Sequence, residues 1–145
     1  MFGLFKKKAV APVKSTNEKV ITSAANLLNI QLNLCRSGPD FQAKLHSNFV
    51  RGYFIGFFDS ALQQLGVPLG GDDEFFGLII IGHAGILALD ANNTQQYAST
   101  SLRLQDNAEF SEGQAVGGKD FFDLITEKIR HPAGLIGIFH DIQQH

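Results

Sequence analysis

The stretch Gly52-Tyr53-Phe54-Ile55-Gly56-Phe57-Phe58 lies in the middle of a long helical pattern. It contains no polar side-chain group except the Tyr53 hydroxyl, so we expect protein to surround it on all sides. The pattern runs from about residue 40 to residue 65, and its apolar residues share one helical face: Phe41, Leu45, Phe49, Tyr53, Phe57 and Ala61. Gly66 and Pro68 then close it. The sequence predicts one central helix here, with Phe49, Tyr53 and Phe57 in the core.

An earlier helix is predicted from residue 15 to residue 35. Ser15-Thr16-Asn17-Glu18 has the form of a capping box, in which Ser15 and Glu18 each satisfy a backbone N–H of the other. Apolar residues then recur at helical spacing, namely Ile21, Ala25, Leu28, Leu32 and Cys35. Gly38-Pro39 provides the stop. We expect Cys35 to be a buried, unpaired thiol on this face.

The second half of the chain is less regular. Asp72, Asp73 and Glu74 favour a helix start, because negative charge stabilises that end of the helix dipole. The following run, residues 75–89, is rich in Ile and Gly and fits either a helix or a buried strand. Residues 90–118 are polar and predict a long connection containing at most a short element near Leu102. A helix over 119–130 and an apolar segment over 133–142 complete the chain.

These patterns predict a mainly α fold, a compact bundle of four to five helices with a long polar connection. The alternative is an α+β fold with strands within residues 75–105. The 145 residues match the size of one domain. We therefore expect a single helical domain over residues 15–145 and a flexible basic tail over residues 1–14.

Charge narrows the range of partners. Five lysines fall within the first nineteen residues, and the rest of the chain carries 7 basic and 13 acidic side chains. No Lys or Arg occurs from Gly52 to Leu102, which argues against nucleic-acid binding by the folded body. Charged residues make up 18% of the chain, below the roughly 25% typical of globular domains. We expect the resulting apolar surface to be covered by a protein partner.

Compartment is predicted from the cysteine count and from the apolar runs. The single cysteine forms no internal disulfide, and the order of residues at the start is not that of a secretory signal. The longest nearly uncharged apolar run, residues 75–89, is shorter than the roughly 20 residues of a membrane-spanning helix. We expect a cytoplasmic protein. The tail, with Phe2, Leu4 and Phe5 before its lysines, offers at most a weak contact with an anionic membrane surface.

Two segments of the chain resemble each other. Leu69-Gly70-Gly71-Asp72-Asp73-Glu74-Phe75-Phe76 is echoed by Val116-Gly117-Gly118-Lys119-Asp120-Phe121-Phe122, and His83-Ala84-Gly85 by His131-Pro132-Ala133-Gly134. One interpretation is an internal duplication that pairs His83 with His131 as metal ligands or titrating groups. The other is ordinary helix-start chemistry with histidines near helix ends.

Other candidate sites are weak. Gly52 and Gly56 form a Gly-x-x-x-Gly that indicates close helix packing. Arg51 and Asp59 flank the apolar stretch and are interpreted as rim charges. His140, His145 and Asp141 form a loose C-terminal group.

Recognisable catalytic, phosphate-binding and zinc motifs are absent from the sequence. We therefore assign no catalytic residue, metal ligand or cofactor and lean against an enzyme. The sequence favours a protein-protein interaction or assembly domain that self-associates as a homo-oligomer. The alternative is a small-ligand or metal-binding protein that uses the region of His83 and His131.

Overall fold

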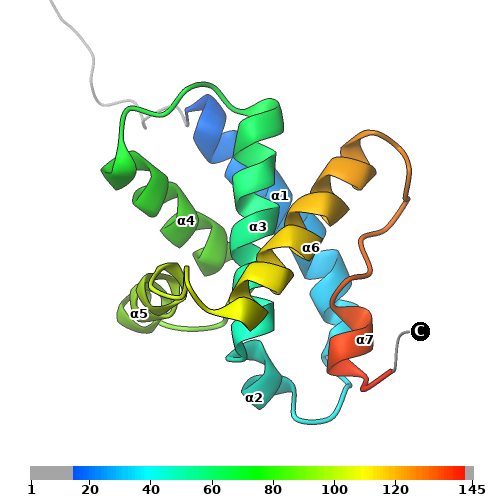
Figure 1. Cartoon of the computed structure of the whole chain (residues 1–145). Coiled ribbons are helices and arrows are strands. Elements are labelled where there is room, and N and C mark those ends of the chain that lie inside the picture. Colours follow the sequence, from blue (N-terminus) through cyan, green and yellow to red (C-terminus); the bar gives the residue numbers. More distant parts are fainter. Residues whose placement is uncertain (1–14, 143–145) are drawn as a thin grey trace, which may run out of the picture.

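The computed structural model describes residues 15–142, and seven helices follow one another over this range (Figure 1). They are α1 (Thr16–Cys35), α2 (Phe41–Leu45), α3 (Asn48–Leu65), α4 (Asp72–Ile86), α5 (Ala91–Leu102), α6 (Ala108–Ile125) and α7 (Ile136–Phe139). The described residues contain no strand. The mainly α prediction is confirmed, and the alternative with strands within residues 75–105 is wrong. The predicted tail, residues 1–14, lies outside the described residues.

Helix α1 begins and packs as its sequence predicts. The Ser15 side chain accepts a hydrogen bond from the Glu18 backbone N–H at 3.1 Å. The predicted apolar face is buried throughout, from Ile21 to Cys35. Burial raises the pKa of the Cys35 thiol to about 11, so this thiol is protonated at neutral pH.

Helix α3 is central, but it is shorter than predicted. The expected helix over residues 40–65 is interrupted at His46-Ser47, where α2 ends and α3 begins. The Ser47 hydroxyl donates to the carbonyl of Lys44 at 2.7 Å and accepts from the N–H of Val50 at 3.4 Å, so it caps both ends of the break. Tyr53 and Phe57 are fully buried as predicted, whereas Phe49 is only half-buried.

The predicted long connection over residues 90–118 is wrong, because it contains α5 and the first half of α6. Asp90 caps α5 by accepting from the N–H of Asn93 at 2.8 Å, and Asn107 caps α6 by accepting from the N–H of Phe110 at 2.9 Å. These polar residues look like turns in the sequence, but they mark helix starts. As a result α6 begins eleven residues before the predicted start at residue 119 and ends at Ile125.

Helices α3 and α6 cross in direct backbone contact. A methyl group on Gly52 or Gly56 of α3 would lie 2.0 Å from a carbonyl oxygen of α6, and one on Gly113 or Gly117 of α6 would lie 2.0 or 2.1 Å from a carbonyl oxygen of α3. Each helix therefore presents two glycines, spaced i and i+4, to the other. The close packing expected at Gly52 and Gly56 is confirmed. The facing glycines on α6, Gly113 and Gly117, lie in the segment that the sequence predicted to be a connection.

The proposed internal duplication is wrong. Gly71, with φ 156°, makes a turn before α4, whereas Gly117 and Gly118 lie inside α6. Helix α4 continues through His83 to Ile86, but α6 ends six residues before His131. The similarity of the two segments therefore reflects shared residue types and not a shared fold.

Candidate functional site

The structure places His83 and His131 in unlike surroundings and does not bring them together. His83 is fully buried, with ring centroids 5.4 to 6.0 Å from those of Phe54, Phe58 and Tyr97. His131 is exposed in the loop between α6 and α7. Within residues 15–142, no group of three or more His, Cys, Asp or Glu side chains is arranged to hold a metal ion.

The contacts of His83 keep its imidazole neutral. Its Nδ1 lies 2.8 Å from the carbonyl oxygen of Ile79, so this nitrogen carries the proton and donates it. The other ring nitrogen, Nε2, is buried and has no hydrogen-bond partner among the described residues. Burial lowers the pKa of His83 to about 4, and the positive charge of Arg51 contributes in the same direction.

A second polar cluster joins α1, α3 and α6 to the C-terminal loop. The Tyr53 hydroxyl accepts from Gln31 Nε2 at 3.0 Å and donates to Asp120 Oδ2 at 2.5 Å. Asp120 Oδ2 also accepts from the N–H of Gly134 at 2.9 Å, and Gln31 Oε1 accepts from the N–H of Leu135 at 2.8 Å. Burial raises the pKa of Tyr53 far above its usual value. Through these hydrogen bonds, the cluster holds the loop before α7 against the core.

A hollow of about 500 Å³ adjoins this cluster. Val116, Asp120, His131 and Ile138 contribute to its lining. All hydrogen bonds of the Asp120 carboxylate go to the protein's own groups, Tyr53 and Gly134. The hollow therefore combines apolar walls with two acids, Asp120 and Glu112, and the exposed His131.

Arg51, in the first turn of α3, is a buried cation that forms no ion pair with an acid of residues 15–142. The residue is only 9% exposed to solvent. The Nε donates to the carbonyl of His46 at 3.2 Å, and Nη1 donates to the carbonyl of Tyr97 at 2.9 Å and to the Ser101 hydroxyl at 3.0 Å. Its Cζ lies 4.0 Å from the centre of the Tyr97 ring. These contacts tie the start of α3 to α5 and to the end of α2.

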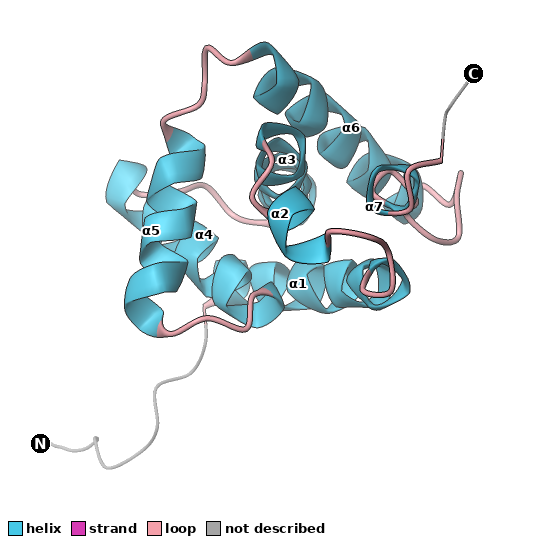
Figure 2. Cartoon of the chain, turned by 90° about the horizontal axis from the view of Figure 1, so that it is seen from below, coloured by secondary structure: helices cyan, strands magenta, loops and turns pink. Residues whose placement is uncertain are grey.

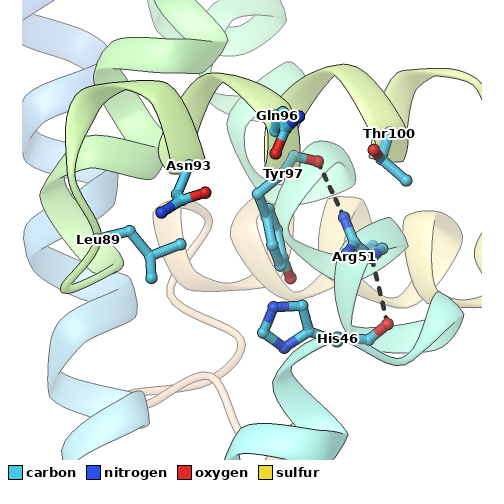
Figure 3. A pocket seen from close by; sticks show the side chains of 7 residues that line it. All are labelled: His46, Arg51, Leu89, Asn93, Gln96, Tyr97 and Thr100. Atoms are coloured by element: carbon cyan, nitrogen blue, oxygen red, sulfur yellow. Dashed lines mark hydrogen bonds between the residues drawn. The ribbon is translucent and has the colours of Figure 1, made fainter.

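Figure 3 shows the hollow beside this arginine, with a volume of about 210 Å³. Tyr97 holds one wall, because its hydroxyl donates to the carbonyl of Leu45 at 2.5 Å. The His46 ring lies edge-on to Tyr97, with centroids 5.5 Å apart. The complete lining is His46, Arg51, Leu89, Asn93, Gln96, Tyr97 and Thr100. No acidic side chain is among them.

The remaining charged candidates are structural. Arg51 and Asp59 do not pair, since Arg51 turns inward and Asp59 accepts from Gln63 at 2.9 Å. Asp141 forms an ion pair with Lys44 at 2.7 Å, and His140 Nε2 lies 2.7 Å from the carbonyl oxygen of Leu34. The C-terminal residues therefore hold α7 against α1 and α2, while His145 lies outside the described residues.

The outward side of α4 is a different kind of candidate site. Every exposed or half-buried residue from position 75 to position 89 is apolar, and the set is Phe75, Phe76, Gly77, Ile80, Ile81, Ala84, Gly85, Ala88 and Leu89. The only polar side chain in this range, that of His83, points into the core. We call this set the α4 outer face. A helix on the surface of a globular protein ordinarily turns polar residues to solvent.

The residues of the candidate hollow that sequence reasoning missed lie on α5. The sequence analysis interpreted residues 90–118 as a connection. It therefore gave no reason to place Gln96, Tyr97 and Thr100 beside Arg51. The spacing of Thr94, Tyr97, Ala98 and Ser101, all buried in the structure, is the helical signal that could have identified this segment.

A comparison of this chain with known protein families, with curated proteins and with solved structures found no match. Taken one at a time, the helices within residues 15–142 are too short or too polar to cross a membrane, and only α4 and α5 together, bent by 120°, reach the required length and composition.

Proposed function

We propose that this chain is an assembly domain that binds a second copy of itself through the α4 outer face. One observation carries the proposal, namely that α4 presents only apolar residues outward beyond its acidic first turn of Asp72, Asp73 and Glu74. Ile81 and Leu89 are 39% and 40% exposed, although both are large apolar side chains. Burying them against a partner removes apolar surface from water, at roughly 25 cal/mol per Å². The low charged fraction of the chain supports the same conclusion.

Gly77 supports close approach by another helix. A methyl group on this residue would meet nothing within 4 Å, so the fold of the single chain does not require glycine here. Glycine inside a helix costs roughly 0.5–1 kcal/mol relative to alanine. A neighbouring backbone that packs against α4 in the assembly would give this glycine a role.

The arrangement of the α4 outer face suits a second copy. Gly77 and Gly85 lie four residues before and after Ile81, on one row of the helix. An antiparallel pairing about a twofold axis at Ile81 places each of these glycines near a glycine of the other copy, and places Ile81 against its own equivalent. Gly85 also accommodates Ala25 of α1, whose Cβ lies 3.0 Å from the position of an added methyl group. Between Gly77 and Gly85 this row carries no charged side chain, and the next residue of the row is Asp73 at the exposed start of α4.

The test is sedimentation velocity of the full chain over a wide concentration range. We expect the wild-type protein to self-associate and Ile81→Arg to remain monomeric, because the substitution places two like charges at the twofold axis. Ile81 is exposed in the single chain, so the variant should keep its helical circular dichroism spectrum.

Ile138→Arg is the matched control. Ile138 is 37% exposed, close to the value for Ile81, and α7 lies on the opposite side of the molecule from α4 in both views (Figures 1 and 2). We expect this variant to associate as the wild type does. A wild-type protein that stays monomeric at all concentrations, or an equal loss of association in both variants, would overturn the proposal.

A further inference from the structure

Arg51 is a charged group whose environment within the chain is incomplete. A guanidinium stays protonated in proteins, so burial does not remove its charge. Burial lowers its pKa, which confirms that the charged form is disfavoured by its surroundings. Buried charges are ordinarily paired with an opposite charge. The ion pairs formed within residues 15–142 are Lys44 with Asp141 and Lys119 with Asp123, and neither includes Arg51.

Part of the guanidinium is also free to bond. Nε and Nη1 together make three hydrogen bonds, all to neutral acceptors. Nη2 makes none with the residues that the structure describes. Since Arg51 lines the hollow of about 210 Å³ and Nη2 is not among the buried unpaired atoms, this nitrogen is the part of the side chain open to a ligand.

The walls of the hollow define the chemistry of that ligand. Gln96 and Thr100, one turn apart on α5, bring an amide and a hydroxyl that can donate or accept. Leu89 supplies apolar surface, and His46 adds an imidazole ring with a polar edge (Figure 3). The nearest acid along α5 is Asp90, which caps that helix and accepts from the N–H and the Nδ2 of Asn93. The hollow thus offers a positive charge, neutral polar groups and an apolar wall.

We propose that this hollow binds a small organic anion, whose carboxylate or phosphate group accepts hydrogen bonds from Nη2 of Arg51 while its carbon atoms lie against Leu89. The oxyanion supplies Arg51 with the opposite charge that no acid of the described residues provides. Its hydrogen bonds are charge-assisted on both sides and are therefore stronger than those Arg51 makes to carbonyls. The charged and polar groups of this site come from α3 and α5, and the α4 outer face shares only Leu89 with it. The ligand test therefore reads out anion binding separately from self-association.

The test uses thermal unfolding of the full chain at constant ionic strength, with chloride as the reference anion. The probes are inorganic phosphate, acetate, butyrate, a short-chain alkyl phosphate and butyramide, the neutral counterpart of butyrate. We expect at least one oxyanion to raise Tm in a saturable way while butyramide does not, because ligand that binds the folded state stabilises it by mass action. The carboxylate and phosphate arms then distinguish the two sources of the oxyanion.

Substitution of Arg51 itself would also remove its three hydrogen bonds to α5 and to the end of α2, so a different variant is decisive. Gln96→Glu changes the side chain by one group and supplies a negative charge within the hollow. It should raise Tm without ligand and weaken oxyanion binding at least about tenfold, because the new carboxylate competes for Arg51.

Gln95→Glu, one residue earlier, has the same net charge and does not line this hollow. It should leave the affinity within about twofold of the wild-type value, since an exposed charge outside the site is well screened. The proposal is overturned if no oxyanion exceeds chloride at millimolar concentration, or if both variants weaken binding equally.

Discussion

Glycines on one helical row occur both at the crossing of α3 with α6 and on the α4 outer face, but their surroundings differ. They are four residues apart at the crossing, whereas Gly77 and Gly85 of α4 are eight residues apart. At the crossing, a methyl group on any of the four glycines would lie within about 2 Å of a carbonyl oxygen of the facing helix. On α4, a methyl group on Gly77 would meet nothing within 4 Å. At the crossing, the helix that packs against the glycines belongs to the same chain. On the α4 outer face, nothing in the described chain packs against Gly77. A spacing of small residues predicts close approach without indicating whether the partner belongs to the same molecule.

The two sides of α4 extend this comparison. Gly82, on the inner side, would place a methyl group 2.8 Å from the ring of Phe58. His83 lies beside it in the core, where Nδ1 of its ring lies 2.8 Å from the carbonyl oxygen of Ile79. The inner side is thus fixed by specific contacts, while the outer side carries apolar groups without them. The expected effect of a substitution on stability decreases from the crossing of α3 with α6, through the inner side of α4, to the α4 outer face.

The largest effect is expected at the crossing. Phe57 is fully buried and packs edge-on against Phe121, with ring centroids 5.1 Å apart. Phe57→Ala should reduce the free energy of unfolding by about 3–5 kcal/mol, through lost burial and the cavity left behind. Urea titration measures this loss. Phe122→Ala, at a residue 40% exposed on α6, should cost under about 1 kcal/mol, and equal losses would place the core elsewhere.

Neighbouring glycines on α6 provide the next test. Gly117→Ala should destabilise the protein by about 3 kcal/mol, because its methyl group would meet the backbone of Tyr53 and force the helices apart. Gly118→Ala should be neutral or stabilising, since the nearest atom is the carbonyl oxygen of Gly56 at 3.5 Å. Chemical denaturation of both variants gives the comparison. Similar stability in the two would contradict direct backbone contact at the crossing.

The inner side of α4 should give stability a dependence on pH. The unfolded chain protonates His83 near pH 6.5, but the folded chain resists protonation until about pH 4. Stability should therefore fall as pH decreases through this window, with His83 contributing up to about 3 kcal/mol of the loss. His83→Leu should flatten the dependence, because Leu does not titrate. Urea titrations from pH 7 to about pH 4 test this, and identical slopes in the two proteins would refute it.

The smallest effect is expected on the α4 outer face. Gly77→Ala should stabilise the isolated chain by about 0.5–1 kcal/mol, because alanine favours the helix and no neighbour obstructs its methyl group. The same change should weaken self-association, if a helix of a second copy approaches there. Thermal unfolding at low protein concentration measures the stability of the isolated chain, and sedimentation at high concentration measures self-association. A less stable isolated chain would show that the fold itself requires this glycine.

The sequence by itself determined the elements that carry a local signal. The capping box at Ser15, the buried row from Ile21 to Cys35 and the acidic start of α4 depend on neighbours within a few residues. These patterns predicted α1 and the start of α4, whereas residues 75–89 fitted either a helix or a buried strand. The apolar stretch around Tyr53 likewise identified the central helix. Its break at Ser47 was missed, because a serine cap interrupts a helix without changing the apolar spacing.

Only the tertiary structure decided which distant residues meet. Helix α5 is too polar to be recognised by its apolar content, and it becomes a wall of the core because Tyr97 packs on Arg51 and bonds to Leu45. The charge of Arg51 is visible in the sequence, but its burial without an acid depends on the packing of α2, α3 and α5. His83 and His131 look like a pair in the sequence, yet one lies in the core and the other in a loop. Burial, and with it the pKa of His83, arises from contacts between helices far apart along the chain, which residue spacing does not encode.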